Sequence, residues 1–371
     1  MELNSTFNDE TEGSGFSEMP SAVPSPTSIL TPVQRGILSG IMIFISISGC
    51  VGNIVVICAV ALSKKLRCIT NVFVVNLAVA DLMTCLNIPW MVVAILSVDG
   101  WPLPDWICSS CGFTLIVCIG SSIYTLACIA TIRYVVITGT PGRCQTIYTT
   151  PKLCTIITLI WTVPLLLAFV PIVFDLGKLG YDFKYSSCTW DTGHHNSENL
   201  SKILAATYYP LPFIVITYSY LKILFHVRRH SRTVGVLLTV SSTVRPVGAI
   251  TASAAAGSLP GNPPSARQIS SQSHNPRENN PPLEHNNVRA KINRRQVEVT
   301  KNMFYIVCVF LLCISPFGFS LFYEKSDPVI PYAGMLIFCN SCINPFVYAT
   351  KHPVFKKVIW LILKCKFSKI S

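Results

Sequence analysis

Charged residues are scarce in this sequence, and the short motifs of soluble enzymes are missing from it. Only 12% of the 371 residues are charged, about half the share usual in a soluble globular domain, whereas 51% are hydrophobic. No P-loop, GxSxG or HExxH motif occurs, so nothing predicts an enzyme. The cysteine and histidine spacing typical of a metal centre does not occur either, so we expect no metal site.

Acidic residues are also in the minority. The 17 Asp and Glu residues stand against 29 Lys and Arg residues, which gives a net charge of +12. In a soluble protein this excess would favour nucleic-acid binding, but here the basic residues cluster at the ends of long apolar runs, as membrane topology requires. The mean hydropathy of +0.51 likewise indicates lipid as the solvent. We therefore expect a membrane protein and no nucleic-acid partner.

Long apolar runs dominate what is present. Each is long enough to span about 30 Å of hydrocarbon as a helix, and helices are expected because backbone groups in lipid must be satisfied internally. The sequence thus predicts an all-α membrane protein, a seven-transmembrane helix bundle with a short amphipathic C-terminal helix. The seven runs lie near residues 36–62, 72–96, 106–137, 153–174, 203–225, 302–323 and 329–350.

The orientation follows from the connections between these runs. Lys and Arg gather in the links 1–2, 3–4 and 5–6 and after the seventh run, for example in "SKKLRC" and "KINRRQVEVTK", and the other links are balanced or acidic. The positive-inside rule then predicts a multi-pass plasma-membrane protein with its N-terminus outside. The expected parts are an extracellular N-terminus over 1–35, a membrane domain over 36–350 with a disordered cytoplasmic loop over 231–290, and an amphipathic helix and tail over 351–371. Glycosylation sequons at Asn4 and Asn199 both fall outside.

Each predicted helix contains its own polar or proline marker. The markers in chain order are Asn53, Asp81 in "NLAVAD", Arg133 with Tyr134, Trp161, Pro210 with Tyr218, Pro316, and "NPFVY" from Asn344 to Tyr348. Intramembrane polar residues are functional candidates by default. This series resembles the rhodopsin-like G-protein-coupled receptor family over roughly residues 36–366.

The resemblance implies that the cytoplasmic end of the third helix meets a heterotrimeric G protein. In the family the arginine matching Arg133 follows an acidic residue that restrains it, whereas Ile132 stands there in this chain. The sixth helix begins with Gln296 where many members place a second acid, so we expect measurable ligand-free signalling. The residues that the resemblance assigns to coupling and activation are Ile132, Arg133, Tyr134, Tyr218, Asn344, Pro345 and Tyr348.

Three further expectations rest on the same resemblance. Cys108 and Cys188 are expected to form a disulfide, which the oxidising outer side permits. Cys365, after the predicted amphipathic helix, is a palmitoylation candidate. Asp81 is expected to join a polar network that could hold a sodium ion, because hard cations prefer oxygen ligands; a network of water alone is the alternative. The other members of that network would be Asn53, Ser122, Asn340 and Asn344.

The predicted ligand pocket is apolar. The position that the resemblance gives to an opsin's Schiff-base lysine is Phe338, and that of an amine receptor's aspartate is Leu115. We therefore expect a neutral or lipophilic small ligand. The candidate pocket residues are Trp90, Leu115, Ile119, Trp190, Tyr208, Tyr209, Phe317, Phe319, Tyr323 and Tyr332.

Stretches such as "IGSSIYTLACIATIRY" and "SSCTW" are similar to melatonin receptors and their orphan relatives. Melatonin receptors differ at positions that include Pro345, Thr192 and Ile314, so an orphan relative is the expectation. A peptide-activated receptor and a non-signalling receptor-like scaffold remain alternatives. A transporter or channel is disfavoured, because the odd helix count comes without internal repeats.

Overall fold

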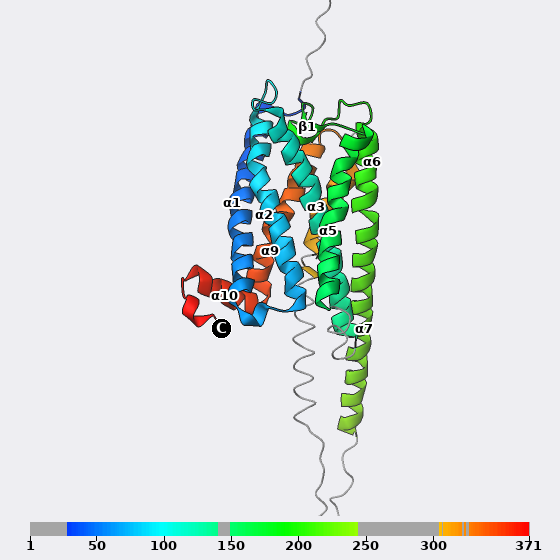
Figure 1. Ribbon diagram of the computed structural model, residues 1–371. Coiled ribbons are helices and arrows are strands. Elements are labelled where there is room, and N and C mark those ends of the chain that lie inside the picture. The colour runs from blue at the N-terminus through cyan, green and yellow to red at the C-terminus, as the bar shows by residue number, and fades with distance from the viewer. Residues whose placement is uncertain are drawn as a thin grey trace, which may run out of the picture.

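Apolar helices lie side by side in one bundle (Figure 1). This computed structural model describes residues 28–139, 149–243, 304–305, 307–320, 323 and 326–370. Six helices in the described part are long and apolar enough to cross a membrane, and a shorter apolar helix, Val307–Ser320, lies in the sixth predicted run. The predicted seven-helix class is thereby confirmed.

The helix bounds agree with the predicted runs to within a few residues, except in the fifth run. That run is divided at Tyr209, just before Pro210, whose ring prevents a regular backbone hydrogen bond at that point. Its second half continues past residue 231, where we expected a disordered loop, and residues 244–303 of that region lie outside the described residues. The helices are α1 (Pro32–Leu62), α2 (Ile69–Leu96), α3 (Asp105–Thr138), α5 (Thr150–Phe174), α6 (Ser197–Tyr208), α7 (Pro210–Thr243), α9 (Ile330–Lys351) and α10 (Pro353–Leu363), with short 3₁₀ turns η1 (Lys64–Leu66) and η2 (Phe367–Lys369).

Helix α3 lies at the centre of the bundle, and 78% of its most apolar window is buried against 22% for α5. An apolar helix that leaves most of its surface uncovered in the bundle is suited to face lipid. At its start, α1 has a capping box in which the Thr31 hydroxyl accepts a bond from Gln34 N–H and Gln34 Oε1 accepts one from Thr31 N–H. Buried Arg35 then donates to the carbonyls of Ile95 and Ser97, which ties the start of α1 to the end of α2.

A two-stranded antiparallel hairpin closes one end of the bundle (Figure 1). Strands β1 (Leu179–Asp182) and β2 (Ser187–Trp190) pair with Tyr181 opposite Cys188. Cys188 is disulfide-bonded to Cys108 in the first turn of α3, as the family resemblance implied. The hairpin backbone also passes so close to Gly112 that a side chain there would collide with Thr189 O. We call this the hairpin end and the opposite one the α10 end.

The α10 end carries the short C-terminal helix that the sequence predicted. The His352 ring Nδ1 accepts a bond from Phe355 N–H at 3.4 Å and caps α10. Phe355, Val358 and Ile359 form its buried stripe at i, i+3 and i+4, and the Phe355 ring stacks on Tyr348 of α9 at 5.3 Å. The exposed side of α10 carries Lys356 and Lys357 together with the apolar Trp360 and Leu363, which suits a helix that lies at a membrane surface.

We expect Cys108→Ser and Cys188→Ser to reduce surface expression and lower the thermal unfolding midpoint to the same extent. Losing a native disulfide typically costs about 2–5 kcal/mol. The double variant should be no worse than either single one, because both remove the same bond. Cys111→Ser is the matched control, since Cys111 is a free buried thiol in the same helix. Normal expression and stability of both single variants would show that the bond contributes nothing.

Candidate functional site

A cavity of about 640 Å³ lies between α3, the hairpin, α6, the 307–320 helix and α9. Its deep walls are apolar, and Leu115 lies there with only 2% of its surface exposed. The Tyr208 hydroxyl, which would otherwise be a polar group in an apolar wall, donates to Ile116 O at 3.0 Å. Apolar residues that line the cavity include Leu115, Ile116, Ile119, Ile123, Ile314, Phe317, Met335, Ile337 and Phe338.

The rim of the cavity at the hairpin end is charged. Asp327, just before α9, pairs with Lys184 Nζ at 2.8 Å and accepts a bond from the Tyr185 hydroxyl at 2.6 Å. The hydrogen bond from Lys184, followed by that from Tyr185, lowers the pKa of Asp327 below its ordinary value. Burial raises the pKa of the Asp182 carboxyl, which accepts bonds from the N–H groups of Lys184 and Tyr185. These contacts fasten the hairpin to the segment before α9 across the cavity mouth.

Most of the predicted pocket residues do line this cavity. Leu115, Ile119, Trp190, Tyr208, Tyr209, Phe317 and Tyr323 are among its walls. The predictions for Phe319 and Trp90 are wrong, because these side chains are 75% and 40% exposed on the outside of the bundle. Tyr332 is not in the cavity wall and packs instead against a cluster formed by α1, α2, α3 and α9. Phe319 follows Phe317 by two residues, which turns it about 200° around a helix.

A second polar site surrounds Asp81 in the middle of α2. The carboxylate is fully buried, and Oδ1 accepts bonds from the hydroxyls of Ser122 at 3.2 Å and Ser341 at 3.0 Å. Its Oδ2 accepts one from Asn344 Nδ2 at 2.8 Å. A buried carboxylate is costly unless such donors surround it. The network therefore joins α2, α3 and α9 at one point, and Ser341 is a member that the sequence analysis did not identify.

The remaining predicted members lie at the edge of this network. Asn53 Nδ2 donates to Ser341 O at 2.8 Å and to Gly49 O at 2.9 Å, so it links α1 to α9 without reaching the carboxylate. Asn340 is buried, and its Oδ1 has no hydrogen-bond partner among the described residues. Two hydroxyl oxygens converge on one carboxylate oxygen, which is the donor set that a small hard cation prefers. The residues present thus fit a sodium ion.

A third group lies around Arg133 near the α10 end of α3. Arg133 is 5% exposed and interacts electrostatically with Tyr220 of α7 and Tyr348 of α9. The hydroxyls of both tyrosines are buried and have no hydrogen-bond partner among the described residues. Ile132, the preceding residue, is 1% exposed and packs in the main hydrophobic core. Three helices therefore converge on the arginine.

The structure brings Tyr220 rather than Tyr218 to Arg133. Tyr218 is 53% exposed, and its ring meets Tyr134 edge-on at 6.2 Å on the periphery of the bundle. The prediction of Tyr218 at the switch is wrong, because residues two apart point to nearly opposite sides of a helix. Asn344 and Pro345 are buried in α9, as expected of a packed "NPFVY" segment, and Pro345 packs so tightly against α1 that only Gly52 fits opposite it.

Tyr220→Phe is expected to reduce G-protein activation roughly tenfold or more, whereas Tyr218→Phe should leave it unchanged. The first change removes a buried hydroxyl beside Arg133, and the second removes one from the periphery. A hydrogen bond to a charged group contributes about 1.5–3 kcal/mol, which would correspond to roughly tenfold or more if the hydroxyl bonds only in the active state. Nucleotide exchange at matched surface expression measures both variants. Equal effects of the two changes would contradict the assignment of Tyr220.

The modification sites stay predictions. Asn4 lies outside the described residues, and Asn199 is exposed in the first turn of α6. Cys365 is an exposed free thiol directly after α10, at a left-handed turn with a φ of 52°. Accessibility at Asn199 and Cys365 is compatible with glycosylation and acylation respectively.

Residues 52–348 match the family described as 7 transmembrane receptor (rhodopsin family). The alpha-1D adrenergic receptor of Mus musculus is 27% identical over 322 residues, which cover 85% of this chain and 55% of that receptor. The melatonin receptor type 1B of Mus musculus is 32% identical over 231 residues, 60% of this chain and 61% of that one.

A solved structure agrees with the helix arrangement. The crystal structure of squid rhodopsin superposes with a TM-score of 0.67 at 20% identity, covering 94% of this chain and 93% of that one. At 20% identity this structural similarity shows a shared fold alone. This chain spans little more than half the length of the adrenergic relative. The family match, in contrast, extends from α1 to Tyr348 of α9 and includes Asp81, Arg133 and the "NPFVY" segment. The chain belongs to the rhodopsin-like family of seven-transmembrane G-protein-coupled receptors.

Proposed function

We propose that this multi-pass plasma-membrane protein binds a neutral or lipophilic small molecule in the cavity at the hairpin end and activates a heterotrimeric G protein at the α10 end. The observation that carries the proposal is the division of the bundle: an apolar cavity of about 640 Å³ at one end and the buried Arg133 group at the other. The Asp81 network lies between them and touches α2, α3 and α9. A ligand in the cavity can shift the equilibrium between the inactive and the active receptor only if it binds the two states with different affinities.

The lining of the cavity supports a ligand without strong charge. Leu115 and Phe338 occupy the deep wall at the positions where the family's amine receptors and opsins have aspartate and lysine. The acidic groups of the cavity are at its rim, where Asp327 pairs with Lys184 and Glu198 pairs with Lys202 at 2.6 Å. An ammonium ion in the deep cavity would therefore have no carboxylate partner among the described lining residues.

The charged rim supports a second candidate, a peptide ligand. Its side chains of both signs, including Asp182, Lys184, Glu198 and Lys202, could pair with the ends or side chains of a peptide that lies across the mouth. Melatonin is disfavoured, because Ile314 and Thr192 in the cavity wall depart from what melatonin receptors have at those positions.

The orientation belongs to the same proposal. Lys64, Lys65 and Arg67 lie at the α10 end in and beside η1, and further lysines follow α9. The positive-inside rule then places the hairpin end and the N-terminus outside. The Cys108–Cys188 bond at the hairpin end supports this, since disulfides persist on the oxidising side.

One experiment tests the proposal. Cells that express the full chain are screened with neutral, lipophilic, amine and peptide libraries while the activation of each G-protein class is recorded. Ile119→Trp, which fills part of the cavity, should abolish the response to a true ligand and keep ligand-free signalling. A response that survives this change would place the ligand elsewhere, and hits confined to peptides would favour the second candidate.

We further propose that Asp81 with the hydroxyls of Ser122 and Ser341 holds a sodium ion that favours the inactive state. Raising the sodium concentration should then lower agonist affinity by a factor within about 5–150-fold, the usual range of allosteric coupling. Asp81→Asn should abolish this sensitivity, because the amide keeps the size of the side chain but loses its charge. Radioligand or fluorescent-ligand binding in sodium against N-methylglucamine measures it, and sodium-independent affinity in the parent protein would remove the ion from the account.

A further inference from the structure

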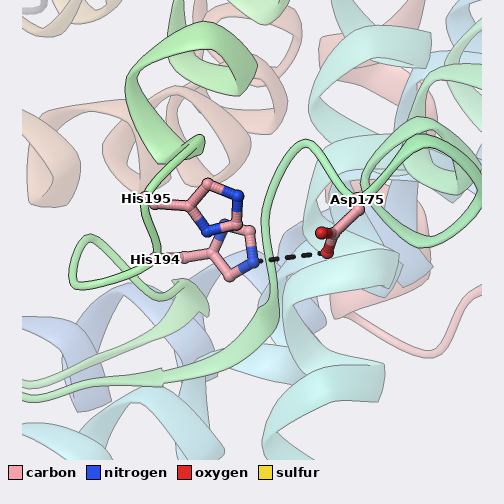
Figure 2. A group of neighbouring side chains, drawn as sticks. All are labelled: Asp175, His194 and His195. Atoms are coloured by element: carbon pink, nitrogen blue, oxygen red, sulfur yellow. Dashed lines mark ion pairs between the residues drawn. The ribbon is translucent and has the colours of Figure 1, made fainter.

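Three metal-ligating side chains come together at the hairpin end (Figure 2). They are Asp175 at the end of α5 and the adjacent His194 and His195, which lie between β2 and α6. One ligand atom from each lies within 4.8 Å of the others. His194 Nε2 is 3.4 Å from Asp175 Oδ1, and the two imidazole rings lie 4.4 Å apart at an angle of 33°. We propose that this group binds a zinc ion, although the sequence spacing predicted no metal site.

Local contacts hold the three side chains at the same place. Asp175 ends α5 in the left-handed conformation, with a φ of 52°, which directs the chain away from the helix axis. Asn196 Nδ2 donates to Asp175 O at 3.0 Å and lies 2.9 Å from His195 Nε2, so one amide joins the two segments. The Asp191 carboxylate accepts a bond from Gly193 N–H at 2.9 Å and tightens the turn that presents the histidines.

The donor set determines which cation fits. Two imidazole nitrogens and one carboxylate oxygen are ligands that zinc accepts in tetrahedral sites, with a water molecule as the fourth ligand. Each imidazole offers the ion the lone pair of one nitrogen. His194 Nδ1 accepts a bond from Asn196 N–H at 3.3 Å, so binding through Nε2 requires this ring to exchange that bond for a proton on Nδ1. Calcium and magnesium prefer sites made of oxygen and would bind here only weakly. The exposure of Asp175 and His195 leaves an open path for the ion from solvent.

A bound zinc ion would also change the cavity mouth. Thr192 and Ser197 flank the two histidines, line the cavity and are joined by a bond from Ser197 Oγ to Thr192 O at 3.1 Å. Coordination would cross-link this segment to the end of α5. The backbone amides from 192 to 197 should then exchange hydrogen more slowly with zinc than without it. Access of a ligand to the cavity would thereby depend on zinc, an effect that rests on the proposed function, whereas metal binding itself does not.

The experiment uses the full chain, purified through an affinity tag without histidine and reconstituted in nanodiscs. Cobalt(II) is titrated as a spectroscopic probe, and zinc, calcium and magnesium are then added as competitors. We expect one cobalt ion per chain with the visible absorption of a site containing nitrogen ligands, displaced by zinc and not by equal calcium or magnesium. His194→Gln and Asp175→Asn should each weaken binding by at least about 10-fold, the loss typical even of groups that only support a metal ligand.

Two features of the variants keep the result interpretable. Asparagine tolerates the left-handed conformation, so Asp175→Asn removes the charge without straining the backbone. His226→Gln, an exposed histidine on α7, is the matched control and should bind as the parent does. Unchanged cobalt affinity in His194→Gln and Asp175→Asn, or no cobalt bound by the parent at millimolar concentration, would overturn the zinc site. Either result would leave the proposed receptor function untouched.

Discussion

Arg133→Ala is expected to abolish measurable G-protein activation while the receptor still reaches the cell surface. Arg133 lies at the α10 end of α3, where α7 and α9 contribute Tyr220 and Tyr348 to its surroundings. Truncating an arginine at the centre of an interface commonly costs 2 kcal/mol or more, which is about 30-fold or more in affinity. The loss should be larger in nucleotide exchange than in ligand affinity, since the cavity lies at the other end of the bundle.

Arg228→Ala is the matched control for that change. Arg228 is exposed on α7 and lies at the same end of the bundle. Its loss removes one positive charge without touching the convergence of α3, α7 and α9, so activation should fall only slightly. Ligand binding and thermal stability should stay near parental values in both variants. Activation that survives Arg133→Ala would show that coupling proceeds through other residues.

Ile132→Asp is expected to lower ligand-free signalling by about one order of magnitude. An aspartate next to Arg133 could form a charge-assisted hydrogen bond in the inactive state, worth about 1–3 kcal/mol, and each 1.4 kcal/mol shifts a two-state equilibrium tenfold. Ligand-free nucleotide exchange at matched surface expression is the measurement. An unchanged or raised rate would mean that something other than a neighbouring acid controls Arg133.

The burial of Ile132 makes a second variant necessary. Ile132 is 1% exposed and packs in the main core, so any smaller polar residue also removes apolar contacts there. Ile132→Asn has nearly the size of aspartate without its charge. If the restraint is electrostatic, aspartate lowers ligand-free signalling and asparagine does not. Equal effects of the two substitutions would assign the change to lost packing.

The fold could be predicted from the sequence because the length and hydropathy of an apolar run identify a membrane helix. The runs from residue 36 to residue 350 agree with the observed helices to within a few residues, apart from the division at Tyr209. Cys108 and Cys188 could be paired only through the family resemblance, since nothing in their spacing brings residues 80 apart together. Regular helices and a shared family pattern therefore account for most of what was predicted correctly.

The rotation of a helix about its own axis could not be predicted where the helix follows a break in the chain. The second half of the fifth run begins after the break at Tyr209, and this half contains two prolines, Pro210 and Pro212, and two tyrosines, Tyr218 and Tyr220, each pair two residues apart. Pattern alone could not say whether Tyr218 or Tyr220 faces Arg133, because that depends on the rotation of α7 after the break. For the same reason the sequence could not show that Phe317 faces the cavity and Phe319 faces outward.

Contacts between distant segments were missed for a different reason. Ser341 joins the Asp81 network because α9 packs against α2, and the serine is as inconspicuous in the sequence as any other. His194 and His195 are visible as neighbours, but their third partner, Asp175, is at the far side of the hairpin. Only the returning strand of the hairpin brings it to them, so no spacing rule could have detected the group.

Signal transmission through Arg133 can be measured with purified components alone. The purified parent receptor and Arg133→Ala are reconstituted in vesicles with each class of heterotrimeric G protein, and nucleotide exchange is measured without ligand. We expect the parent to raise exchange above that of empty vesicles for at least one class, and Arg133→Ala not to. A correctly folded parent that accelerates no class, or an Arg133→Ala variant as active as the parent, would contradict this expectation.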